Sequence, residues 1–485
     1  MIDTKALRSR VLDLAIQGKL TEQLESDGTA EELYQQILAE KQKLISEGKH
    51  KKEKPLPPIK PGEIPFEIPE NWLWLRHNDL FELSGGSQPS KAEFINEPKE
   101  GYIRLYQIRD YGNNPVPVYI PMTYASKTTR KGDVLLARYG ASLGKVFIAE
   151  EGAYNVAMAK VVSLFESTLI DKNYLFWYYR SKLYQNAIMM MSRSAQSGFN
   201  KDDLNSLLFL LPPLAEQKRI VERVEEIFRL LDAIDEAQEK YSADAESLKA
   251  KLITAGIQGK LTEQLPSDGT AEELYQQIQV EKQRLIKEGK IKKEKPLPAI
   301  KDEEIPFEIP GNWKWVRLSE LTVKITSGST PAGGKKGNAY VNEGYCFFRE
   351  QNIYNDGIHT DGMVYISEEL LKTRENSTVL PNDILLNITG GSIGRCAIIP
   401  DDFSKGSINQ HILIIRLVEK EMLNYIHDLL CSPYYQGIIQ SKVVGDKDGF
   451  SGGRCKATLI PLPPLAEQKR IAEVLERVLG ALSLQ

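Results

Sequence analysis

A 61-residue stretch occurs twice in this chain of 485 residues, at 16–76 and at 257–317, and 49 positions are identical between the copies. A second shared element follows each copy, a sequence of ten residues that begins at Leu211 and returns unchanged at Leu462. The shared parts frame two blocks, 71–210 and 312–461, that share only a faint pattern. A common scaffold holding two different modules has this organisation, so we expect the variable blocks to carry specificity.

The composition is typical of a folded chain without a membrane segment. A length of 485 residues suits about three domain-sized units, and 41% hydrophobic residues is sufficient for globular cores. The chain has no run of about 18 apolar residues, the length that would be needed to span a bilayer. The N-terminus also lacks the apolar core of a signal peptide. We therefore expect a cytoplasmic protein.

Charge and cysteine usage narrow the possible chemistry. The net charge of −4 does not by itself indicate a nucleic-acid binder, so any contact with a polyanion must use local patches. All four cysteines, Cys346, Cys396, Cys431 and Cys455, fall in the second variable block, without C-x-x-C spacing or a nearby His pair. We interpret them as buried free thiols rather than metal ligands.

Each long repeat contains a helix followed by a proline-rich segment. The helix begins with a capping box, Thr29 with Glu32 and Thr270 with Glu273, in which each side chain satisfies the other residue's free backbone N–H. Prolines then follow at high density from Pro55 onward, which prevents helix and favours extended backbone. The sequence therefore predicts a stiff boundary before each variable block.

The region after the first block has the most regular apolar pattern in the chain. A helix from Leu214 to about Ala255 would be roughly 60 Å long, and its apolar residues alternate in steps of four and three, which is typical of a coiled-coil seam. Such a helix needs a partner for its apolar stripe. The seam positions are Ile220, Val224, Ile227, Leu231, Ile234, Leu248 and Leu252.

The two ends of the chain supply that partner. The C-terminal segment repeats the front of the seam as Ile471, Leu475, Val478 and Leu482, and the N-terminal segment repeats its back as Leu7, Val11 and Leu14. Together they reconstruct the central helix with a short gap. We therefore predict a circular, pseudo-twofold organisation in which the paired helices run antiparallel.

These features match a known family. Two variable domains separated by a helical repeat, each followed by the helix start Pro-Pro-Leu-Ala-Glu-Gln-Lys-Arg-Ile, give a chain that closely resembles the specificity subunit of type I restriction-modification systems. The resemblance implies an α+β fold with two α/β target recognition domains separated by long antiparallel coiled-coil helices. The expected parts are a distal helical region from 1–25 and 462–485, helical and Pro-rich repeats at 26–70 and 257–311, recognition domains at 71–210 and 312–461, and a central helix at 211–256.

The resemblance also implies partners and a mechanism. Each recognition domain would read one half of a split target in double-stranded DNA, and the helical spacer would set the gap between the halves. The helices would dock two adenine methyltransferase subunits, with restriction subunits joining outside. S-adenosylmethionine, ATP and Mg²⁺ would be cofactors of those partners, and this chain would bind none.

Two faint parallels between the blocks supply candidate DNA contacts. A strand followed by a Gly-rich turn occurs at 133–145 and 383–395, and a short apolar run followed by an Arg-containing turn occurs at 104–108 and 349–353. Arg suits guanine and Gln or Asn suits adenine, although a surface salt bridge or a loop hydrogen bond explains any one of them equally well. The candidates are Arg104, Gln107, Arg109, Arg138, Tyr139, Lys145, Arg349, Gln351, Asn352, Asn387, Thr389 and Arg395, with Lys335 and Lys336 near a Ser-rich loop at 327–330 as candidate phosphate contacts.

We assign no catalytic residue and no metal. The chain has neither the Asn-Pro-Pro-Tyr-like loop nor the Gly-rich cofactor turn expected of an adenine methyltransferase, and its five His residues show no triad or ligand spacing. We expect a recognition subunit rather than an enzyme. Two alternatives are a coiled-coil scaffold whose modules bind proteins, and a truncated or allelic specificity subunit.

Overall fold

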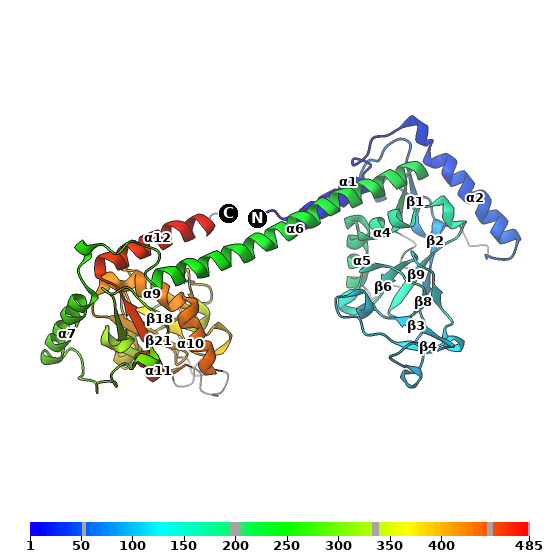
Figure 1. Ribbon diagram of the computed structural model, residues 1–485. Coiled ribbons are helices and arrows are strands. Elements are labelled where there is room, and N and C mark those ends of the chain that lie inside the picture. Colours follow the sequence, from blue (N-terminus) through cyan, green and yellow to red (C-terminus); the bar gives the residue numbers. More distant parts are fainter. Residues whose placement is uncertain (51–54, 195–203, 205–206, 332–338, 444–449, 484–485) are drawn as a thin grey trace. The chain divides into compact units, whose positions relative to one another are not determined.

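The computed structural model describes residues 1–50, 55–194, 204, 207–331, 339–443 and 450–483. The chain divides into two compact units, Met1–Glu239 and Lys240–Gln485. Each unit contains one long repeat, one variable block and part of the helical region (Figure 1). Within the described ranges no helix is long and apolar enough to cross a membrane.

The first unit begins with two helices of the shared scaffold. Helix α1 covers Thr4–Ile16, and α2 covers Ala30–Ser46, which begins with the predicted capping box: the Thr29 side chain accepts from the backbone N–H of Glu32, and the Glu32 carboxylate accepts from that of Thr29. After the Pro-rich segment comes strand β1, Leu73–Arg76, which pairs antiparallel with β10, Leu208–Leu211. The whole variable block therefore leaves and re-enters the scaffold through two neighbouring strands.

The first variable block consists of two four-stranded sheets with helices beside them. The first sheet has the order β2-β9-β6-β7, and the second has the order β4-β3-β8-β5, with β3 and β8 parallel. Short helix α3, His77–Leu80, leads into this block, and α4 and α5 close it. The bounds are β2 Phe81–Gly85, β3 Tyr102–Tyr106, β4 Tyr119–Pro121, β5 Thr128–Thr129, β6 Val134–Ala137, β7 Val146–Ile148, β8 Gly152–Tyr154, β9 Met158–Ser163, α4 Lys172–Arg180 and α5 Lys182–Ser194.

The second unit repeats this plan with different side chains. Helix α7, Ala271–Lys287, again begins with a capping box, and β11, Lys314–Arg317, pairs with β22, Leu459–Leu462. The two sheets have the orders β12-β21-β18-β19 and β16-β13-β20-β17, again with one parallel pair, β13 with β20. The predicted α+β fold with two like domains is confirmed.

The remaining bounds of the second unit are as follows: β12 Thr322–Ser327, β13 Tyr345–Phe348, β14 Ile353–Tyr354, β15 Gly357–Ile358, β16 Val364–Ile366, α8 Glu368–Lys372, β17 Thr378–Val379, β18 Ile384–Asn387, β19 Cys396–Ile398, β20 Gly406–Ile408, β21 Ile412–Leu417, α9 Leu423–Cys431, α10 Pro433–Val443, α11 Gly452–Ala457 and α12 Leu465–Ser483.

The long central helix α6 covers Leu214–Ile257, 44 residues, as the apolar pattern predicts. In the first unit α1 lies beside it (Figure 1), where Thr4 bonds Asp235 and Arg8 pairs with Asp232. Residue numbers rise along α1 as they fall along α6, so this pair is antiparallel as predicted. In the second unit Ile471 and Leu475 of α12 lie against Gly256 of α6.

Most seam positions are buried or half-buried, but the back of the seam is shifted. Leu7 is 42% exposed and Leu248, its counterpart at the offset between the long repeats, is 43% exposed, so the prediction that these two lie inside the seam is wrong. The buried residues there are Leu12 and Ile16 in α1 and Ile253 and Ile257 in α6. The helix ends pack onto the cores of the units rather than along a single heptad line, which moves the buried face by one residue. Among the front positions, Ile220, Val224, Leu231, Ile471 and Leu475 are buried, and Ile227, Ile234, Val478 and Leu482 are half-buried. The other back positions, Val11, Leu14 and Leu252, are half-buried.

The two separate repeats of each unit bind each other. The buried carboxylate of Glu216, in the first turn of α6, accepts hydrogen bonds from Trp72 Nε1 at 2.7 Å, Gln23 Nε2 at 2.7 Å and Thr21 Oγ1 at 3.1 Å. Burial raises the pKa of Glu216, and these three donors oppose that rise. One turn later Arg219 pairs with Asp27.

The second unit has the same network at the corresponding residues. Glu467 accepts from Trp313 Nε1 at 2.8 Å, Gln264 Nε2 at 2.8 Å and Thr262 Oγ1 at 3.2 Å, and Arg470 pairs with Asp268. The long repeat and the helix start therefore form one structural frame around each variable block. This frame explains physically why the two repeated segments occur together in each half of the chain.

Candidate nucleic-acid interface

The Gly-rich segments form tight turns between paired strands in both blocks. β6 pairs with β7 and β18 pairs with β19, and the connecting turns contain Gly140 at φ 63° and Gly390 at φ 74°, a backbone region that favours glycine. In the first block the guanidinium of Arg138 lies 5.1 Å from the ring centre of Tyr139, whose side chain is 42% exposed. Lys145, at the far end of the turn, is exposed.

The second parallel forms a short 3-10 turn after a central strand in each block. In the first block Arg104 pairs with Asp110 at 3.2 Å and lies over the rings of Tyr106 and Tyr119. Asp110 also accepts from the backbone N–H of Gln107, which is half-buried. Arg104 therefore stabilises the loop. Arg109, which lies within the turn, is exposed.

Two amides proposed for the second block lie inside the fold. Asn352 is fully buried and donates to the backbone of His359 at 3.0 Å. Asn387 is fully buried and donates to the backbone of Glu350 at 2.9 Å and to Ser392 at 3.1 Å. Both side chains are engaged in holding loops, so we leave them out of the proposed contact surface.

The remaining candidates of the second block lie closer to the surface. Arg349 is half-buried and donates to the backbone of Gly362, whereas Gln351 is exposed. Arg395 is half-buried, with its guanidinium 4.5 Å from the ring centre of Tyr354. Lys335 and Lys336 lie outside the residues that the structure describes.

The fold joins the two sequence parallels into one surface in each block. In the second block the Asn387–Glu350 hydrogen bond ties the Gly-rich turn directly to the Arg349–Asn352 turn. In the first block Tyr111, at the end of the corresponding turn, stacks on Phe147 of β7 with ring centres 4.6 Å apart. Segments that are widely separated in sequence thus present neighbouring side chains.

A third loop of the second block joins this surface and was not predicted. Thr389 hydrogen-bonds His411, exposed Gln410 bonds exposed Thr330, and buried Asn409 donates to Glu350 Oε2 at 2.8 Å. Burial alone would raise the pKa of Glu350, but the Asn409 hydrogen bond and the nearby positive charges give a net lowering. The signal in the sequence was the polar run Asn-Gln-His immediately before an apolar strand.

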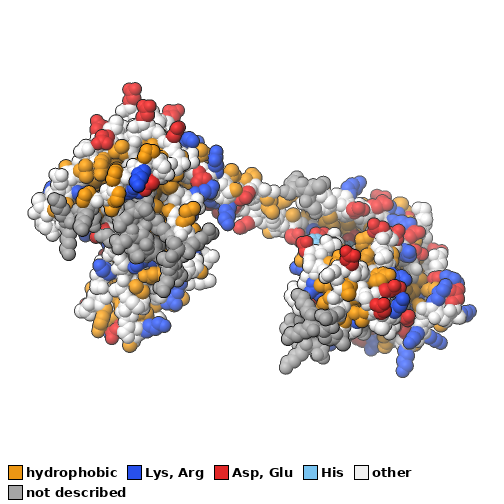
Figure 2. Space-filling model, turned by 180° about the vertical axis from the view of Figure 1, so that it is seen from behind, with side chains coloured by type: hydrophobic (Ala, Val, Ile, Leu, Met, Phe, Trp, Pro, Cys, Tyr) orange, Lys and Arg blue, Asp and Glu red, His pale blue; other side chains and the backbone are white. Residues whose placement is uncertain are grey.

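No single basic face marks the interface in the view of Figure 2. Lys and Arg side chains are interspersed with Asp and Glu over each unit on the face drawn there. This agrees with the net charge of −4 and with the expectation that contacts to a polyanion are local.

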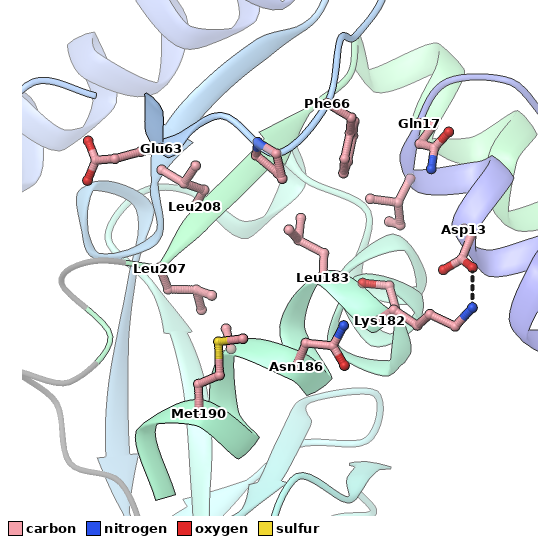
Figure 3. A pocket seen from close by; sticks show the side chains of 14 residues that line it. Asp13, Gln17, Glu63, Phe66, Lys182, Leu183, Asn186, Met190, Leu207 and Leu208 are labelled. Atoms are coloured by element: carbon pink, nitrogen blue, oxygen red, sulfur yellow. Dashed lines mark hydrogen bonds and ion pairs between the residues drawn. The ribbon is translucent and has the colours of Figure 1, made fainter. Parts of the chain in front are cut away.

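The first unit also has a cavity of about 790 Å³ between α1, the Pro-rich segment, α5 and β10 (Figure 3). Its walls include Phe66, Leu183 and Leu207, and the charged groups Asp13 and Lys182 pair with each other at 2.7 Å. The lining provides mainly apolar contact, and we assign it no chemistry.

The chain matches a family profile described as "Type I restriction modification DNA specificity domain" at residues 69–241 and again at 310–484. Two such domains in one chain define a DNA sequence-recognition protein, and this chain belongs to the family of type I restriction-modification specificity subunits. The matches cover both variable blocks and the helix starts that follow them.

Related sequences agree with this assignment, and a solved structure agrees with the fold. The chain is 27% identical to the type I restriction enzyme EcoAI specificity subunit of Escherichia coli, with 98% of this chain and 89% of the relative covered. It is 28% identical to the EcoEI specificity subunit of Escherichia coli, over 68% of this chain and 63% of that protein. A chain from a structure titled for complex assembly and conformational transition of the type I R-M system has a TM-score of 0.58 at 19% identity, over 87% of this chain and 93% of that one. The function is therefore that of a DNA sequence-specificity subunit.

Proposed function

We propose that each variable block reads one half of a split DNA target. The observation that carries this proposal is that two sheets of the same strand order present unlike side chains on the same pair of turns. The Gly-rich turn offers half-buried Arg138 and exposed Tyr139 in the first block and half-buried Thr389 in the second, where Ile388, the counterpart of Arg138, is buried. Equivalent scaffolds with different donors and acceptors suit two different half-sites.

From the exposed and half-buried candidates we select one small set of contact residues in each block. In the first block exposed Arg109 is suited to base edges and exposed Lys145 to phosphate, and Tyr139 lies beside Arg138. In the second block Gln351, Thr389 and Arg395 play these parts. Gln bonds the edge of adenine, and Arg bonds guanine or phosphate.

The helical region is proposed to dock two methyltransferase subunits, one on each unit. Leu7 and Leu248 each precede a long repeat by the same number of residues, and both are exposed apolar side chains, at 42% and 43%. A duplicated exposed leucine gives each unit the same apolar contact point, which suits two copies of one partner. Methyltransferase and restriction subunits would bind S-adenosylmethionine, ATP and Mg²⁺ and catalyse the reactions. This chain would have no catalytic role and would recognise DNA in the cytoplasm.

The length of α6 is proposed to set the number of unspecified bases between the half-sites. An insertion of one helical turn, about four residues, in the exposed middle of α6 should lengthen the gap in the recognised sequence. An unchanged gap in a variant that still directs methylation would contradict the proposal that the length of α6 sets the gap.

The deciding experiment is genome-wide mapping of N6-methyladenine in cells with the methyltransferase partner, with and without this chain. A split motif that appears only with the chain is the expected result. Replacing Tyr139 by Ala should alter one half of the motif and replacing Thr389 by Ala the other half. Absence of any new motif despite a stable complex would overturn the proposal.

A further inference from the structure

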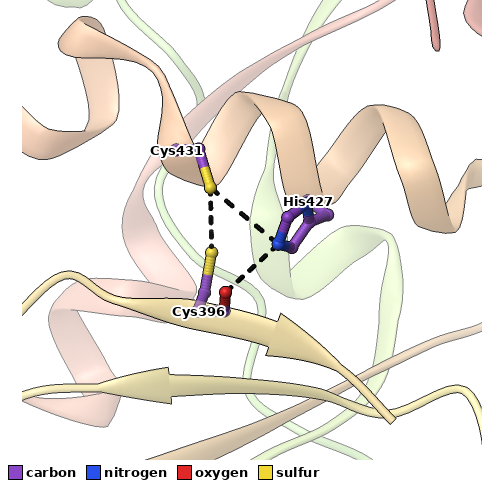
Figure 4. Close-up of side chains that lie close together, drawn as sticks. All are labelled: Cys396, His427 and Cys431. Atoms are coloured by element: carbon purple, nitrogen blue, oxygen red, sulfur yellow. Dashed lines mark hydrogen bonds between the residues drawn. The ribbon is translucent and has the colours of Figure 1, made fainter. Parts of the chain in front are cut away.

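The second block contains a cluster of metal-binding side chains outside the proposed DNA surface. Cys396 lies on β19, and His427 and Cys431 lie one turn apart on α9. Figure 4 shows the two helical side chains pointing toward Cys396. The three possible ligand atoms lie within 4.8 Å of one another. We propose that these residues form a binding site for one zinc ion, which fastens α9 to the sheet.

The distances between the ligand atoms fit a tetrahedral zinc ion. Zinc binds sulfur at about 2.3 Å and nitrogen at about 2.1 Å, which separates two sulfurs by about 3.8 Å and sulfur from nitrogen by about 3.6 Å. Here Cys396 Sγ and Cys431 Sγ are 3.4 Å apart, and Cys431 Sγ and His427 Nε2 are 3.9 Å apart. Small side-chain rotations bring all three atoms to bonding distance. The sulfurs are also well beyond the roughly 2.05 Å of a disulfide.

The surroundings supply the support that a zinc-binding histidine needs. His427 Nε2 lies 3.1 Å from the carbonyl oxygen of Cys396, a contact that zinc would replace. Its other nitrogen, Nδ1, lies 3.9 Å from the Asp428 carboxylate, beyond hydrogen-bond distance, and a small side-chain rotation would bring this carboxylate close enough to accept the Nδ1 proton and orient the ring. Cys396 is fully buried and the His427 side chain is only 15% exposed, so the ion would be shielded from competing ligands. The fourth position is left for water.

The equivalent place in the first block has no such ligands. Val146 pairs with Leu136 as Cys396 pairs with Leu386. Tyr174 of α4 bonds the backbone of β10 as Tyr425 of α9 bonds that of β22, which makes Phe176 and Arg180 the counterparts of His427 and Cys431. In the first block Arg180 stacks on Phe176 instead, with its guanidinium 5.2 Å from the ring centre. At this contact between helix and sheet, the first block has packed side chains, whereas the second block has three potential metal ligands.

The test is zinc binding by the full-length chain, purified under reducing conditions, treated with a chelator, reloaded with zinc sulfate and gel-filtered. We expect about one zinc ion per chain, a zinc-dependent rise in the unfolding temperature of the second unit, and a thiolate-to-metal absorption band when cobalt replaces zinc. Cys396→Val and His427→Phe, which install the residues of the first block, should abolish retention. Cys346→Ala, at a half-buried cysteine outside the cluster, is the matched control and should retain the metal.

Asp428→Asn should weaken zinc binding by about tenfold while leaving the ligands in place. Failure of the wild-type chain to retain zinc, equal retention by Cys396→Val and Cys346→Ala, or isolation of Cys396 and Cys431 as a disulfide would each overturn the proposal. Should both ligand variants fail to fold, the cobalt spectrum of the wild-type chain still decides, because only thiolate ligation gives the charge-transfer band.

Discussion

The two units hold their variable blocks in the same way and fill them differently. Around each block the hydrogen bond from the frame tryptophan to the buried glutamate measures 2.7 Å in one unit and 2.8 Å in the other. Immediately inside the frame, the first unit buries His77 where the second buries Leu318. In the block itself Asp133 pairs with Lys172, whereas Asp383 pairs with Arg416. Contacts within the frame are therefore duplicated, whereas inside the blocks only some are, such as the donation from Gln185 and from Gln436 to a glycine carbonyl of the Gly-rich turn at 2.8 Å.

The largest effect should come from breaking the frame. Replacing Glu216 or Glu467 by Ala leaves three donors, including a buried tryptophan N–H, without their acceptor. We expect each change to lower the free energy of unfolding of its own unit by about 3 kcal/mol, and by similar amounts in the two units. Urea unfolding measures this.

The matched controls are Glu222→Ala and Glu473→Ala, at exposed positions one to two turns further along the same helices. These should change stability by less than about 0.5 kcal/mol. If Glu216→Ala and Glu467→Ala lowered the free energy of unfolding in one unit but not in the other, the two hydrogen-bond networks would share their geometry but not their contribution to stability.

Acid should destabilise the first unit more than the second, because only the first buries His77 at this position. Burial lowers the pKa of His77 from 6.5 to about 4, although a hydrogen bond to Asn78 opposes the shift. Between pH 6.5 and pH 4, His77 is therefore protonated in the unfolded chain but neutral in the folded unit. The free energy of unfolding of the first unit is highest above pH 6.5 and decreases as the pH falls toward 4. The expected loss in the first unit is about 2 kcal/mol at pH 5.

Unfolding of the first unit between pH 7 and pH 4 measures this effect, with the His77→Leu variant as its control. That variant takes the residue found in the second unit and should flatten this part of the pH dependence, whatever it does to stability at pH 7. The converse change, Leu318→His, should introduce acid sensitivity into the second unit. An unaltered pH profile in His77→Leu would assign the effect to other groups.

Substitutions at the turns should act on one half-site at a time. Gln351→Ala should relax discrimination in the half-site of the second block by about 1–3 kcal/mol, because Gln351 is the exposed amide of its turn. Lys145→Ala should leave base preference unchanged and reduce the slope of log affinity against log salt by about 0.9. Binding assays on duplexes with single changes in either half, at several salt concentrations, measure both.

Cross-effects would contradict the division of labour between the blocks. If Gln351→Ala altered preference in both halves, the two blocks could not be independent readers. If Lys145→Ala relaxed base preference, Lys145 would have to contact a base edge.

The smallest expected difference is between two glutamines at the helix starts. Both donate to a proline carbonyl, Gln217 to Pro212 and Gln468 to Pro463. The Oε1 of Gln217 also accepts from the backbone N–H of Asp171 at 2.9 Å, whereas the buried Oε1 of Gln468 has no hydrogen-bond partner among the described residues. Replacement by Leu should therefore destabilise the first unit by about 1 kcal/mol more than the second. Equal losses in urea unfolding would indicate that Gln468 finds a partner in solution.

Local patterns predicted the fold well. The capping boxes at Thr29 and Thr270 and the extent of α6 depend on residues a few positions apart, and the structure has them as predicted. The seam prediction failed at Leu7 and Leu248 because a heptad pattern describes a helix that faces one partner. The residues further along, Leu12 and Ile16 in α1 and Ile253 and Ile257 in α6, also pack into the globular cores.

The site was less predictable because its contacts are distant in sequence. Arg and Asn suit base edges and loop hydrogen bonds equally, so nothing in the sequence separates exposed Gln351 from buried Asn352. The bond between Trp72 and Glu216 joins residues from two repeats that spacing alone does not connect. Cys396 similarly reaches His427 and Cys431 only through the packing of α9 on β19.

The pairing of β1 with β10 gives the chain a built-in tolerance to length. Leu73 lies opposite Leu211, so a block of any size starts and ends at points about 5 Å apart. The closure entropy that the frame must overcome rises only as the logarithm of the enclosed length, and the frame gains the same hydrogen bonds whichever block it encloses. A synthetic recognition module should therefore graft onto this chain if its first and last strands finish side by side and antiparallel, however many residues lie between them.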